Sequence, residues 1–298
     1  MENNRTPKKT LVVGGSGFIG RHLTRYLLGD PYFGDVLAPS RANLDLLDPA
    51  SISNYLKSHR PDFVINLAGF ATIKDVDPRT LFDRNTVSVL NLIESLGREG
   101  LAPRVVICSS AYVYAPDPHL ALNEKAPLQP QNLYAVTKIA AEMVIAAIKP
   151  RFEVSIARIF NSVGVGQSTE FLLPRLISAV MSDKFPIRLN NLTDKRDFVD
   201  VRDLCEMFSV ALKAHAMPPV INFCNGQSIS ISEIVDTLSA VTGKTIPVEL
   251  AGVSSTASIV RGDNALIKGL GYEQRYQLAE TLLWMLGESK TAFTVGRI

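Results

Sequence analysis

Three glycines at a spacing of three residues, near the start of the chain, constrain its fold more than any other feature. Segment 10–20 reads TLVVGGSGFIG, so a short β-branched strand runs into Gly14, Gly17 and Gly20, and a helix pattern follows over 21–28. Without a Cβ, the first two glycines let the backbone turn tightly and approach a pyrophosphate, while the third lets the helix lie close on the strand. Gly-rich turns also serve plain strand–helix connections, but a strand before and a helix after are the context that a dinucleotide site requires. The sequence therefore predicts a nucleotide cofactor site at the start of the fold.

Composition places the chain among ordinary globular proteins. Of its 298 residues, 46% are hydrophobic and 20% charged, which excludes a mainly disordered chain. A net charge of +2 without dense Lys/Arg runs gives no indication of nucleic-acid binding. Three widely spaced cysteines (Cys108, Cys205 and Cys224) and no Cys/His cluster with zinc spacing predict buried, reduced thiols and no metal site. No segment reads as a signal peptide or a membrane span, so we expect a cytoplasmic protein without a membrane partner.

Strands and helices alternate along the first half of the chain. Strands are expected over 10–13, 35–38, 63–66, 105–108 and 154–159, with helices over 49–59, within 78–98 and over 134–148. Such alternation favours a Rossmann-type, doubly wound parallel α/β sheet with ligands at the carboxyl ends of its strands. The later pattern is looser, with helices expected over 169–181, 200–214, 230–241 and 278–286 and strands near 187–197, 220–223 and 246–250. We therefore expect an NADP-binding Rossmann domain at 1–160, to which 199–223 returns, and a smaller C-terminal α/β substrate-binding lobe formed by 161–198 and 224–298.

Two short polar motifs point to chemistry at that edge of the sheet. Ser109 and Ser110 follow the fourth expected strand, and Tyr134 and Lys138 are four residues apart, hence on one helix face. Each motif alone has a plainer interpretation, since serines commonly cap loops or helices and a Tyr/Lys pair arises by chance on amphipathic helices. Their order after the glycine turn, and after a strand that ends in NLAG at 66–69, makes coincidence improbable.

These motifs resemble those of the extended short-chain dehydrogenases/reductases of the NAD-dependent epimerase/dehydratase family, which modify nucleotide-sugars. The resemblance covers nearly the whole chain and extends through RIFNSVGVGQ at 158–167, KRDFVDVRD at 195–203 and NFCNG at 222–226. Within the family, the chain is most similar to the GDP-4-dehydro-6-deoxy-D-mannose reductases. The resemblance implies an NADP-dependent oxidoreductase that reduces the C4 ketone of a nucleotide-linked 4-keto-6-deoxy hexose, giving GDP-rhamnose or GDP-6-deoxytalose.

The same resemblance assigns roles to three residues. It implies that Tyr134 is the acid/base, that Lys138 holds the nicotinamide ribose and that Ser110 hydrogen-bonds the reacting oxygen. A free tyrosine has a pKa of about 10, and lowering it by roughly three units takes about 4 kcal/mol. One cation at about 4 Å supplies that much at an effective dielectric constant near 20. We therefore expect Lys138, together with the cationic nicotinamide of the oxidised cofactor, to lower the pKa of the phenol, while Ser110 steadies the developing alkoxide.

Ala111 and Tyr112, which follow the two serines, narrow the type of reaction. Dehydratases of this family carry an Asp-Glu pair at that place, and the epimerase-reductases that make GDP-fucose carry a cysteine where this chain has Tyr112. The resemblance therefore disfavours water elimination and epimerisation at neighbouring carbons. Plain reduction of a C4 ketone is what remains.

The end of the second strand favours NADP(H). NAD enzymes place Asp or Glu there to bind the ribose hydroxyls, whereas this chain has Ser40 and Arg41, which suit a 2′-phosphate together with Arg21 of the first helix. The arginines could instead be merely solvated. Asp45 and Leu46 lie where relatives meet the adenine. The other expected cofactor contacts come from the glycine turn and the strand ends: Gly14, Gly17, Phe18, Ile19, Gly20, Leu67, Ala68, Gly69, Tyr134, Lys138 and Ile159.

For the nucleotide-sugar, the resemblance points to residues after the fifth strand and in the later segments. Arg196 and Arg261 are candidates for the diphosphate, because a guanidinium can hold phosphate oxygens bidentately, although each could instead pair with Asp200 or Asp263. The expected substrate contacts are Thr72, Ser110, Ala111, Tyr112, Asn161, Gln167, Arg196 and Arg261. A GDP-linked sugar is expected, with dTDP and UDP left open.

Two other functions stay open at this point. A nucleotide-sugar 4-epimerase would hold NAD tightly, but no acidic residue ends the second strand. A non-catalytic dinucleotide-binding sensor would have no need of Ser110, Tyr134 and Lys138 together.

Relatives also dimerise by packing two helices from each subunit into a four-helix bundle. The matching segments here are about 81–98 and 134–148, where Ile139, Met143 and Ala147 form an apolar stripe at helical spacing. A homodimer is therefore expected, although the same side chains could pack on the chain's own sheet.

Overall fold

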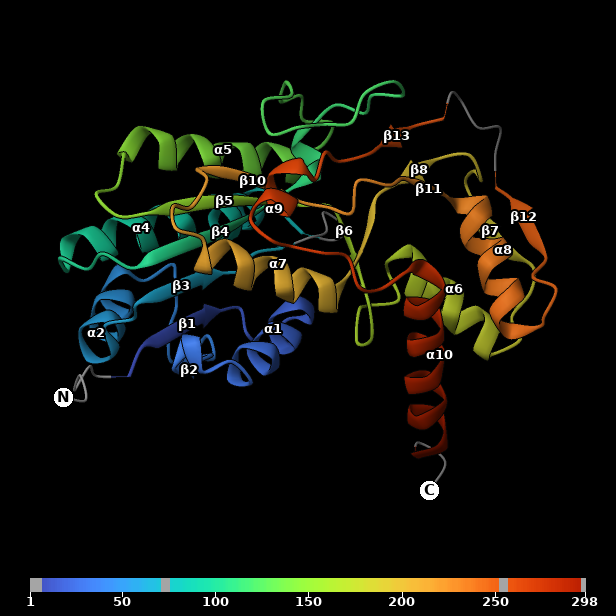
Figure 1. The fold of residues 1–298 in the computed structure, drawn as a ribbon, viewed down its shortest axis with the longest axis horizontal. Coiled ribbons are helices and arrows are strands. Elements are labelled where there is room, and N and C mark those ends of the chain that lie inside the picture. The colour runs from blue at the N-terminus through green and yellow to red at the C-terminus, as the bar shows by residue number, and fades with distance from the viewer. Residues whose placement is uncertain (1–6, 71–75, 252–256, 296–298) are drawn as a thin grey trace.

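A six-stranded parallel sheet forms the centre of the structure, a computed structural model that describes residues 7–70, 76–251 and 257–295, without side chains beyond 288. Its strands are β1 (Lys9–Val13), β2 (Asp35–Leu37), β3 (Phe63–Asn66), β4 (Arg104–Ser110), β5 (Val154–Ile159) and β10 (Val220–Phe223). They lie in the order β10-β5-β4-β3-β1-β2 (Figure 1). Strand β1 pairs with β2 on one side and with β3 on the other. The strand order therefore reverses there, and the topological switch point lies between β1 and β3. The predicted Rossmann-type parallel sheet is confirmed.

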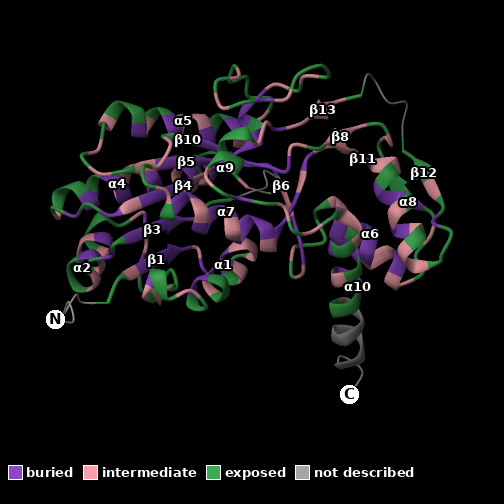
Figure 2. Cartoon of the chain, in the orientation of Figure 1, coloured by how far each residue is buried: buried purple, intermediate pink, exposed green. Residues whose placement is uncertain are grey.

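Helices cover both faces of the sheet because successive strand residues point to opposite sides. On β1, Leu11 and Val13 join one apolar cluster and Val12 joins the other. The first cluster packs against α2 (Pro49–His59), α4 (Ser88–Arg98) and α5 (Leu133–Ile148), and the second against α1 (Phe18–Leu28) and α7 (Val201–Lys213). Figure 2 shows the result as a continuous buried layer along the strands.

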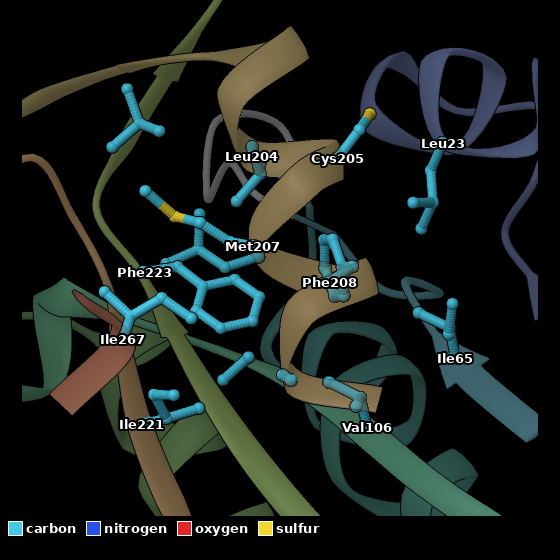
Figure 3. Close-up of a cluster of buried hydrophobic side chains, with 14 of the residues drawn as sticks. Leu23, Ile65, Val106, Leu204, Cys205, Met207, Phe208, Ile221, Phe223 and Ile267 are labelled. Atoms are coloured by element: carbon cyan, nitrogen blue, oxygen red, sulfur yellow. The ribbon is translucent and has the colours of Figure 1, made fainter. Parts of the chain in front are cut away.

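Helix α7 returns from the second half of the chain to complete the face that α1 begins. Its inner side chains join the same apolar cluster as Leu23, and in Figure 3 Phe208 lies over the strands while Cys205 points toward α1. Phe208 meets Phe223 of β10 edge to face, with ring centroids 5.0 Å apart. The strand that ends at Phe223 and the helix before it therefore belong to the same core as the glycine turn.

A third apolar cluster lies beyond the carboxyl ends of the strands. Its members include Leu176 of α6 (Leu172–Met181), Leu238 of α8 (Ile231–Thr242) and Leu282 of α10 (Leu278–Val295). Short strands pair around it as β6 (Asn161–Val163) with β9 (Phe198–Asp200), β7 (Ile187–Leu189) with β12 (Val248–Leu250), and β8 (Lys195–Arg196) with β11 (Ile229–Ser230) and β13 (Ile259–Val260). Other short helical segments are η1 (Pro31–Phe33), η3 (Ala111–Val113) and α9 (Ala265–Gly269). The domain division predicted at residue 160 stays a prediction.

Among the predicted boundaries that differ from the structure, three matter most. Strand β4 continues through Ser109 and Ser110, whose register partners on β5 are Arg158 and Ile159, so the serines end the strand rather than follow it. The helix expected within 78–98 is α3 (Pro78–Phe82), a π-helical turn η2 (Asp83–Val87) and α4. The closing helix α10 runs past residue 286 to Val295, and in Figure 1 its last turns extend away from the body. Among the described residues, no helix is both long and apolar enough to cross a membrane.

Two glycines allow close backbone contacts at the turn after β1. Gly14 has a φ of +81°, and a Cβ there would lie 2.9 Å from the backbone nitrogen of Ala68. A Cβ on Gly20 would lie 2.2 Å from the carbonyl oxygen of Gly14. Without a side chain, Gly14 lets the turn lie against the backbone after β3, and Gly20 lets the start of α1 lie against the turn.

We expect Gly20→Ala to push α1 off the turn, lowering the free energy of unfolding by about 1–3 kcal/mol, the usual cost of overpacking, and weakening dinucleotide binding. Gly29→Ala, at the other end of the helix, is the matched control, because its Cβ would meet nothing closer than 3.4 Å. Urea unfolding and fluorescence titration with NADPH measure both effects. A Gly20→Ala protein as stable as Gly29→Ala would contradict the close contact.

Candidate active site

A cleft of about 670 Å³ opens at the carboxyl ends of β1, β3, β4 and β5, and residues of the third apolar cluster form its opposite wall. This is the size and place expected for a ligand site in an open α/β sheet. The predicted site residues that line it are Gly14, Gly17, Phe18, Ile19, Gly20, Leu67, Gly69, Ser110, Ala111, Tyr112, Tyr134, Lys138, Ile159, Asn161, Gln167 and Arg196. Residues from both halves of the chain therefore meet in one cleft.

The glycine turn fits the diphosphate of a dinucleotide. Helix α1 begins after Gly17, and no side chain caps its N-terminus. The first amide groups of a helix have no partner within the helix, and the helix dipole favours an anion there. The backbone of this turn and the N-terminus of α1 would therefore hold phosphate groups, as the sequence predicts.

Ser110, Tyr134 and Lys138 are brought together by β4 and α5. Helix α5 begins at Leu133 because the side chain of Asn132 accepts a hydrogen bond from the backbone nitrogen of Ala135, 2.9 Å away. The first turns of α5 thereby place Tyr134 and Lys138 beside the end of β4. Lys138 Nζ lies 5.8 Å from the centroid of the Tyr134 ring and donates a hydrogen bond of 2.9 Å to the carbonyl oxygen of Cys108.

Burial decides the protonation of both groups on α5. It raises the pKa of the Tyr134 phenol to about 12, against the opposing effect of a hydrogen bond with Ser110. Burial also lowers the pKa of Lys138, which Cys108 and Glu142 act to raise. The lowered phenol pKa expected from Lys138 does not arise in the protein alone, because desolvation dominates and the ammonium is directed to a backbone carbonyl.

A buried polar network that the sequence analysis did not single out lies directly behind these residues. Glu142 of α5 and Arg158 of β5 form an ion pair with a shortest distance of 2.6 Å, and their side chains are 8% and 5% exposed. Ser109 Oγ donates to Glu142 Oε1 at 2.5 Å. Arg158 Nη1 also donates to the hydroxyl of Tyr114 at 2.9 Å. A carboxylate four residues after Lys138 in an otherwise apolar helix was the signal that could have found it.

Asn85 is a second residue that the sequence analysis missed. It lies in the π-helical turn, and its side chain accepts from Phe70 N at 2.8 Å and donates to Thr137 Oγ1 at 3.0 Å. It also fills the space beside Gly69, whose φ is +143° and where a Cβ would lie 2.5 Å from Asn85 Oδ1. Asn85 therefore fixes the backbone after β3 against the helix that carries Lys138.

On the opposite side of the cleft, Gln167 and Arg196 differ in what they still offer a ligand. Gln167 donates to Ser162 O at 2.8 Å, but its buried Oε1 has no partner among the described residues. Arg196 already donates to the carbonyl oxygens of Lys195 and Ser258 and lies 3.4 Å from the carboxylate of Asp194, not Asp200. Asn161 Nδ2 donates to the Asp197 carbonyl at 3.3 Å.

The structure does not bring every predicted residue to the cleft wall. Arg21 bridges the carbonyl oxygens of Ser16 and Gly166. Leu46 is buried in the sheet core, and Ala68 packs against it. The other residues that do not line the cleft are Ser40, Arg41, Asp45 and Arg261, and Thr72 lies outside the described residues.

Arg41 and Asp45 pair with each other at the end of the second strand region. Arg41 Nη2 lies 3.4 Å from Asp45 Oδ2, and the arginine side chain is 64% exposed. Asp45 also accepts from Leu47 N, and this bond, with the nearby arginines Arg41 and Arg84, lowers its pKa although burial opposes the shift. The predicted contacts of these residues with cofactor stay predictions.

The cysteines and candidate metal ligands add no further site. Cys205 and Cys224 are buried free thiols, as expected, whereas Cys108 is only partly buried and lines the cleft. Burial raises the pKa of the Cys108 thiol to about 12, so it stays protonated. No group of His, Cys, Asp and Glu side chains within the described ranges could hold a metal ion.

Comparisons with known proteins agree with this geometry. The chain is 32% identical over 235 residues to the GDP-6-deoxy-D-talose 4-dehydrogenase of Aggregatibacter actinomycetemcomitans, covering 78% of this chain and 80% of the relative. It is 30% identical over 275 residues to the GDP-6-deoxy-D-mannose reductase of Pseudomonas aeruginosa, covering 88% of each. The solved structure of RMD from Pseudomonas aeruginosa complexed with NADPH superimposes with a TM-score of 0.86 at 26% identity, over 97% of this chain and 100% of that one.

UDP-glucose 4-epimerases match as well, as in Mycoplasma pneumoniae at 28% identity over 80% of this chain and 82% of the relative. Residues 10–224 match the model of the NAD dependent epimerase/dehydratase family. The matched residues include the glycine turn, β4 and α5. The chain therefore belongs to the NAD dependent epimerase/dehydratase family, whose members include nucleotide-sugar oxidoreductases and epimerases.

Proposed function

We propose that this protein is an NADPH-dependent reductase of the C4 ketone of a GDP-linked 4-keto-6-deoxy hexose, with GDP-rhamnose or GDP-6-deoxytalose as product. The observation that carries the proposal is the convergence of Ser110, Tyr134 and Lys138 at the cleft beside the glycine turn. The names of two relatives that act on GDP-6-deoxy sugars support the substrate class. In the proposed domain division, residues 1–160 and 199–223 bind the cofactor, and the remaining residues bind the sugar nucleotide.

In this proposal Tyr134 is the proton donor. The bound cofactor supplies the hydride at C4 of the sugar. The raised pKa of Tyr134, about 12, keeps the phenol protonated at neutral pH, which is the form a reduction consumes. Lys138, held at the Cys108 carbonyl, would bind the nicotinamide ribose and stabilise the phenolate that remains.

Ser110 and the far wall of the cleft would orient the substrate. The Ser110 hydroxyl, at the end of β4, would donate to the ketone oxygen as negative charge develops on it. Gln167 offers an unpartnered acceptor for a hydroxyl or amide of the ligand. The guanidinium of Arg196 and the side chain of Arg261 are the proposed ligands of the diphosphate.

A nucleotide-sugar 4-epimerase with tightly held NAD is the second candidate, because UDP-glucose 4-epimerases are among the relatives. Such an enzyme begins by oxidation with Tyr134 as phenolate: burial disfavours that form in the protein alone, and the cationic nicotinamide of bound NAD would act in the opposite direction. The second strand region also ends in Ser40 and Arg41 rather than in an acid that would bind ribose hydroxyls. A non-catalytic sensor is the weaker alternative, since it would not require a buried phenol beside an ammonium.

We expect Tyr134→Phe to reduce turnover by roughly 10²–10⁴, the usual scale for loss of a general acid, while NADPH binding stays unchanged. The assay is NADPH consumption with a GDP-4-keto-6-deoxy sugar generated in situ by a 4,6-dehydratase, and the product is identified by NMR. Tyr55→Phe is the matched control, because that ring lies on α2, stacked on His59, and does not line the cleft. A wild-type protein that leaves GDP-, dTDP- and UDP-linked 4-keto sugars untouched contradicts the proposal, as does a fully active Tyr134→Phe variant.

The proposed cofactor is NADPH, and Arg41 is its proposed discriminating residue. Its present partner, Asp45, holds it by an exposed ion pair, which is worth only about 0.2–1 kcal/mol and would give way readily to a 2′-phosphate. Arg41→Ala should weaken NADPH binding by about 1–3 kcal/mol and leave NADH binding unchanged. Arg79→Ala, which removes a similar exposed pair with Asp83, is the control. Tighter binding of NADH than of NADPH by the wild type, measured by fluorescence, would overturn the cofactor assignment.

A homodimer through α4 and α5 is also proposed. Val136 and Met143 of α5 are 41% and 66% exposed, and Ala147 continues their stripe, whereas Ile139 packs partly into the protein's own core. Met143→Glu would place a charge at the centre of this face, so we expect it to shift the protein from dimer to monomer in light scattering at micromolar concentration. Leu28→Glu, a substitution of a 65% exposed leucine on α1, should leave the dimer intact. A monomeric wild type would contradict the dimer.

A further inference from the structure

We propose that Glu142 is a positioning residue for the reaction: its buried carboxylate, paired with Arg158, fixes the end of β4 that carries Ser110 against the helix that carries Tyr134 and Lys138. The inference rests on the proposed function, because it concerns how the same site is held for turnover.

The contacts of Glu142 join three elements at one point. Its Oε1 accepts a hydrogen bond of 2.5 Å from the Oγ of Ser109, the residue before Ser110 on β4. Both carboxylate oxygens lie within 3.2 Å of Arg158 Nε on β5, and Oε2 also accepts from Nη2 at 2.6 Å. Because Glu142 follows Lys138 by one turn of α5, the carboxylate sets the height and rotation of that helix relative to β4.

Burial of Glu142 and Arg158 carries a desolvation cost, so their ion pair needs good geometry and hydrogen bonds to its other polar atoms. A buried ion pair stabilises a protein only if hydrogen bonds occupy its remaining donors and acceptors. Here Arg158 Nη1 donates to Tyr114 OH and to the carbonyl oxygen of Glu124, each at 2.9 Å. Tyr114 OH in turn donates to Asn222 Oδ1 on β10, at 2.8 Å. The donors and acceptors around Glu142 therefore form one continuous network beneath the cleft.

The charge of Glu142 also reaches Lys138. Lys138 is 8% exposed, its ammonium donates to the carbonyl oxygen of Cys108, and burial lowers its pKa while Cys108 and Glu142 act in the opposite direction. The groups that face it are the Cys108 thiol from β4, the Tyr134 phenol and Glu142 from α5, and behind Glu142 the Arg158 guanidinium from β5. Loss of the negative charge would leave two cations in the same buried region, so Lys138 would lose its proton at a lower pH.

A comparison of Glu142→Gln with wild type tests this role by readouts that a merely structural residue would not move. We expect kcat to fall by about 10- to 100-fold, the scale of a misplacement of about 1 Å, while the Kd for NADPH changes less than about twofold. The alkaline limb of the pH profile of kcat should move to lower pH, since Lys138 titrates earlier. Glu142→Asp, which keeps the charge, should return that limb toward its wild-type position. A Glu142→Gln protein that has wild-type kcat and pH profile overturns the proposal.

Two further variants keep the test decisive. Ser109→Ala removes one tether without leaving a buried charge, so it should fold even if Glu142→Gln does not, and its kcat should fall by about tenfold at unchanged NADPH affinity. Glu153→Gln is the matched control: Glu153 pairs with Arg104 at the far end of the same two strands, 2.8 Å away, and its loss should leave kcat and the pH profile unchanged. Wild-type kcat in Ser109→Ala, or an equal loss in Glu153→Gln, overturns the role of Glu142.

The failure of this inference and that of the proposed function give different results. Reduction and 4-epimerisation would both use Ser110, Tyr134 and Lys138, so the variants are compared in whichever reaction the wild type performs. Epimerisation without reduction overturns the proposed function and leaves the role of Glu142 decided by the variants. A wild type without either activity overturns both.

Discussion

The Glu142–Arg158 ion pair is the interaction on which the arrangement of the site depends. Strand β4, strand β5 and helix α5 each contribute a residue to it or to its hydrogen bonds, and each also contributes a residue to the cleft: Ser110, Ile159 and Lys138. Apolar packing alone allows a helix to slide or rotate on a sheet at small cost, since dispersion contacts are individually weak and non-directional. A bidentate ion pair between groups less than a tenth exposed admits one register. The sheet core gives α5 its stability, and the ion pair gives it its position.

The cleft has a second fixed point at the glycine turn, on the other side of the cofactor position. There the constraint is steric rather than electrostatic, because Gly20 allows α1 to lie against the turn and Gly14 allows the turn to lie against the backbone after β3. The same helix also reaches the opposite wall of the cleft: Arg21 donates to Gly166 O, and the His22 ring meets Val165 O at 2.8 Å. The loop that carries Gln167 is therefore tied to the helix whose N-terminus would hold phosphate. Through these contacts, α1 would set the distance between the proposed positions of the dinucleotide and the sugar.

Much of this could be predicted from the sequence, and the reason lies in local rules. The glycine spacing, the alternation of β-branched strands with amphipathic helices, and the Tyr134/Lys138 spacing each follow from the geometry of one turn, one strand or one helix. The extension of β4 through Ser110 was not predicted, since it depends on pairing with Arg158 and Ile159, 49 residues further on. The π-helical turn at Asn85 was missed for the same reason: its side chain is held by Phe70 and Thr137, which lie far away in the sequence. The pairing of Arg196 with Asp194 and of Arg41 with Asp45 likewise depends on side-chain positions that local pattern does not fix.

The protonation of Tyr134 connects this architecture to the direction of the chemistry. The sequence analysis expects Lys138 and the cationic nicotinamide of the oxidised cofactor to lower the pKa of the phenol together. In the protein alone, the fold buries both side chains and directs the ammonium to the Cys108 carbonyl, so the phenol is a weaker acid than free tyrosine. A weak acid is still able to protonate an alkoxide, because an alkoxide is a stronger base than a phenolate. Oxidation of an alcohol requires the phenolate at the outset, and burial without a further cation works against that form. The protein alone is thus prepared for the step in which a proton is given up, and it depends on a bound cation for the reverse step. A reductase would meet the phenol with a neutral nicotinamide, whereas an enzyme that begins with oxidation would bring the cationic nicotinamide that its phenolate needs.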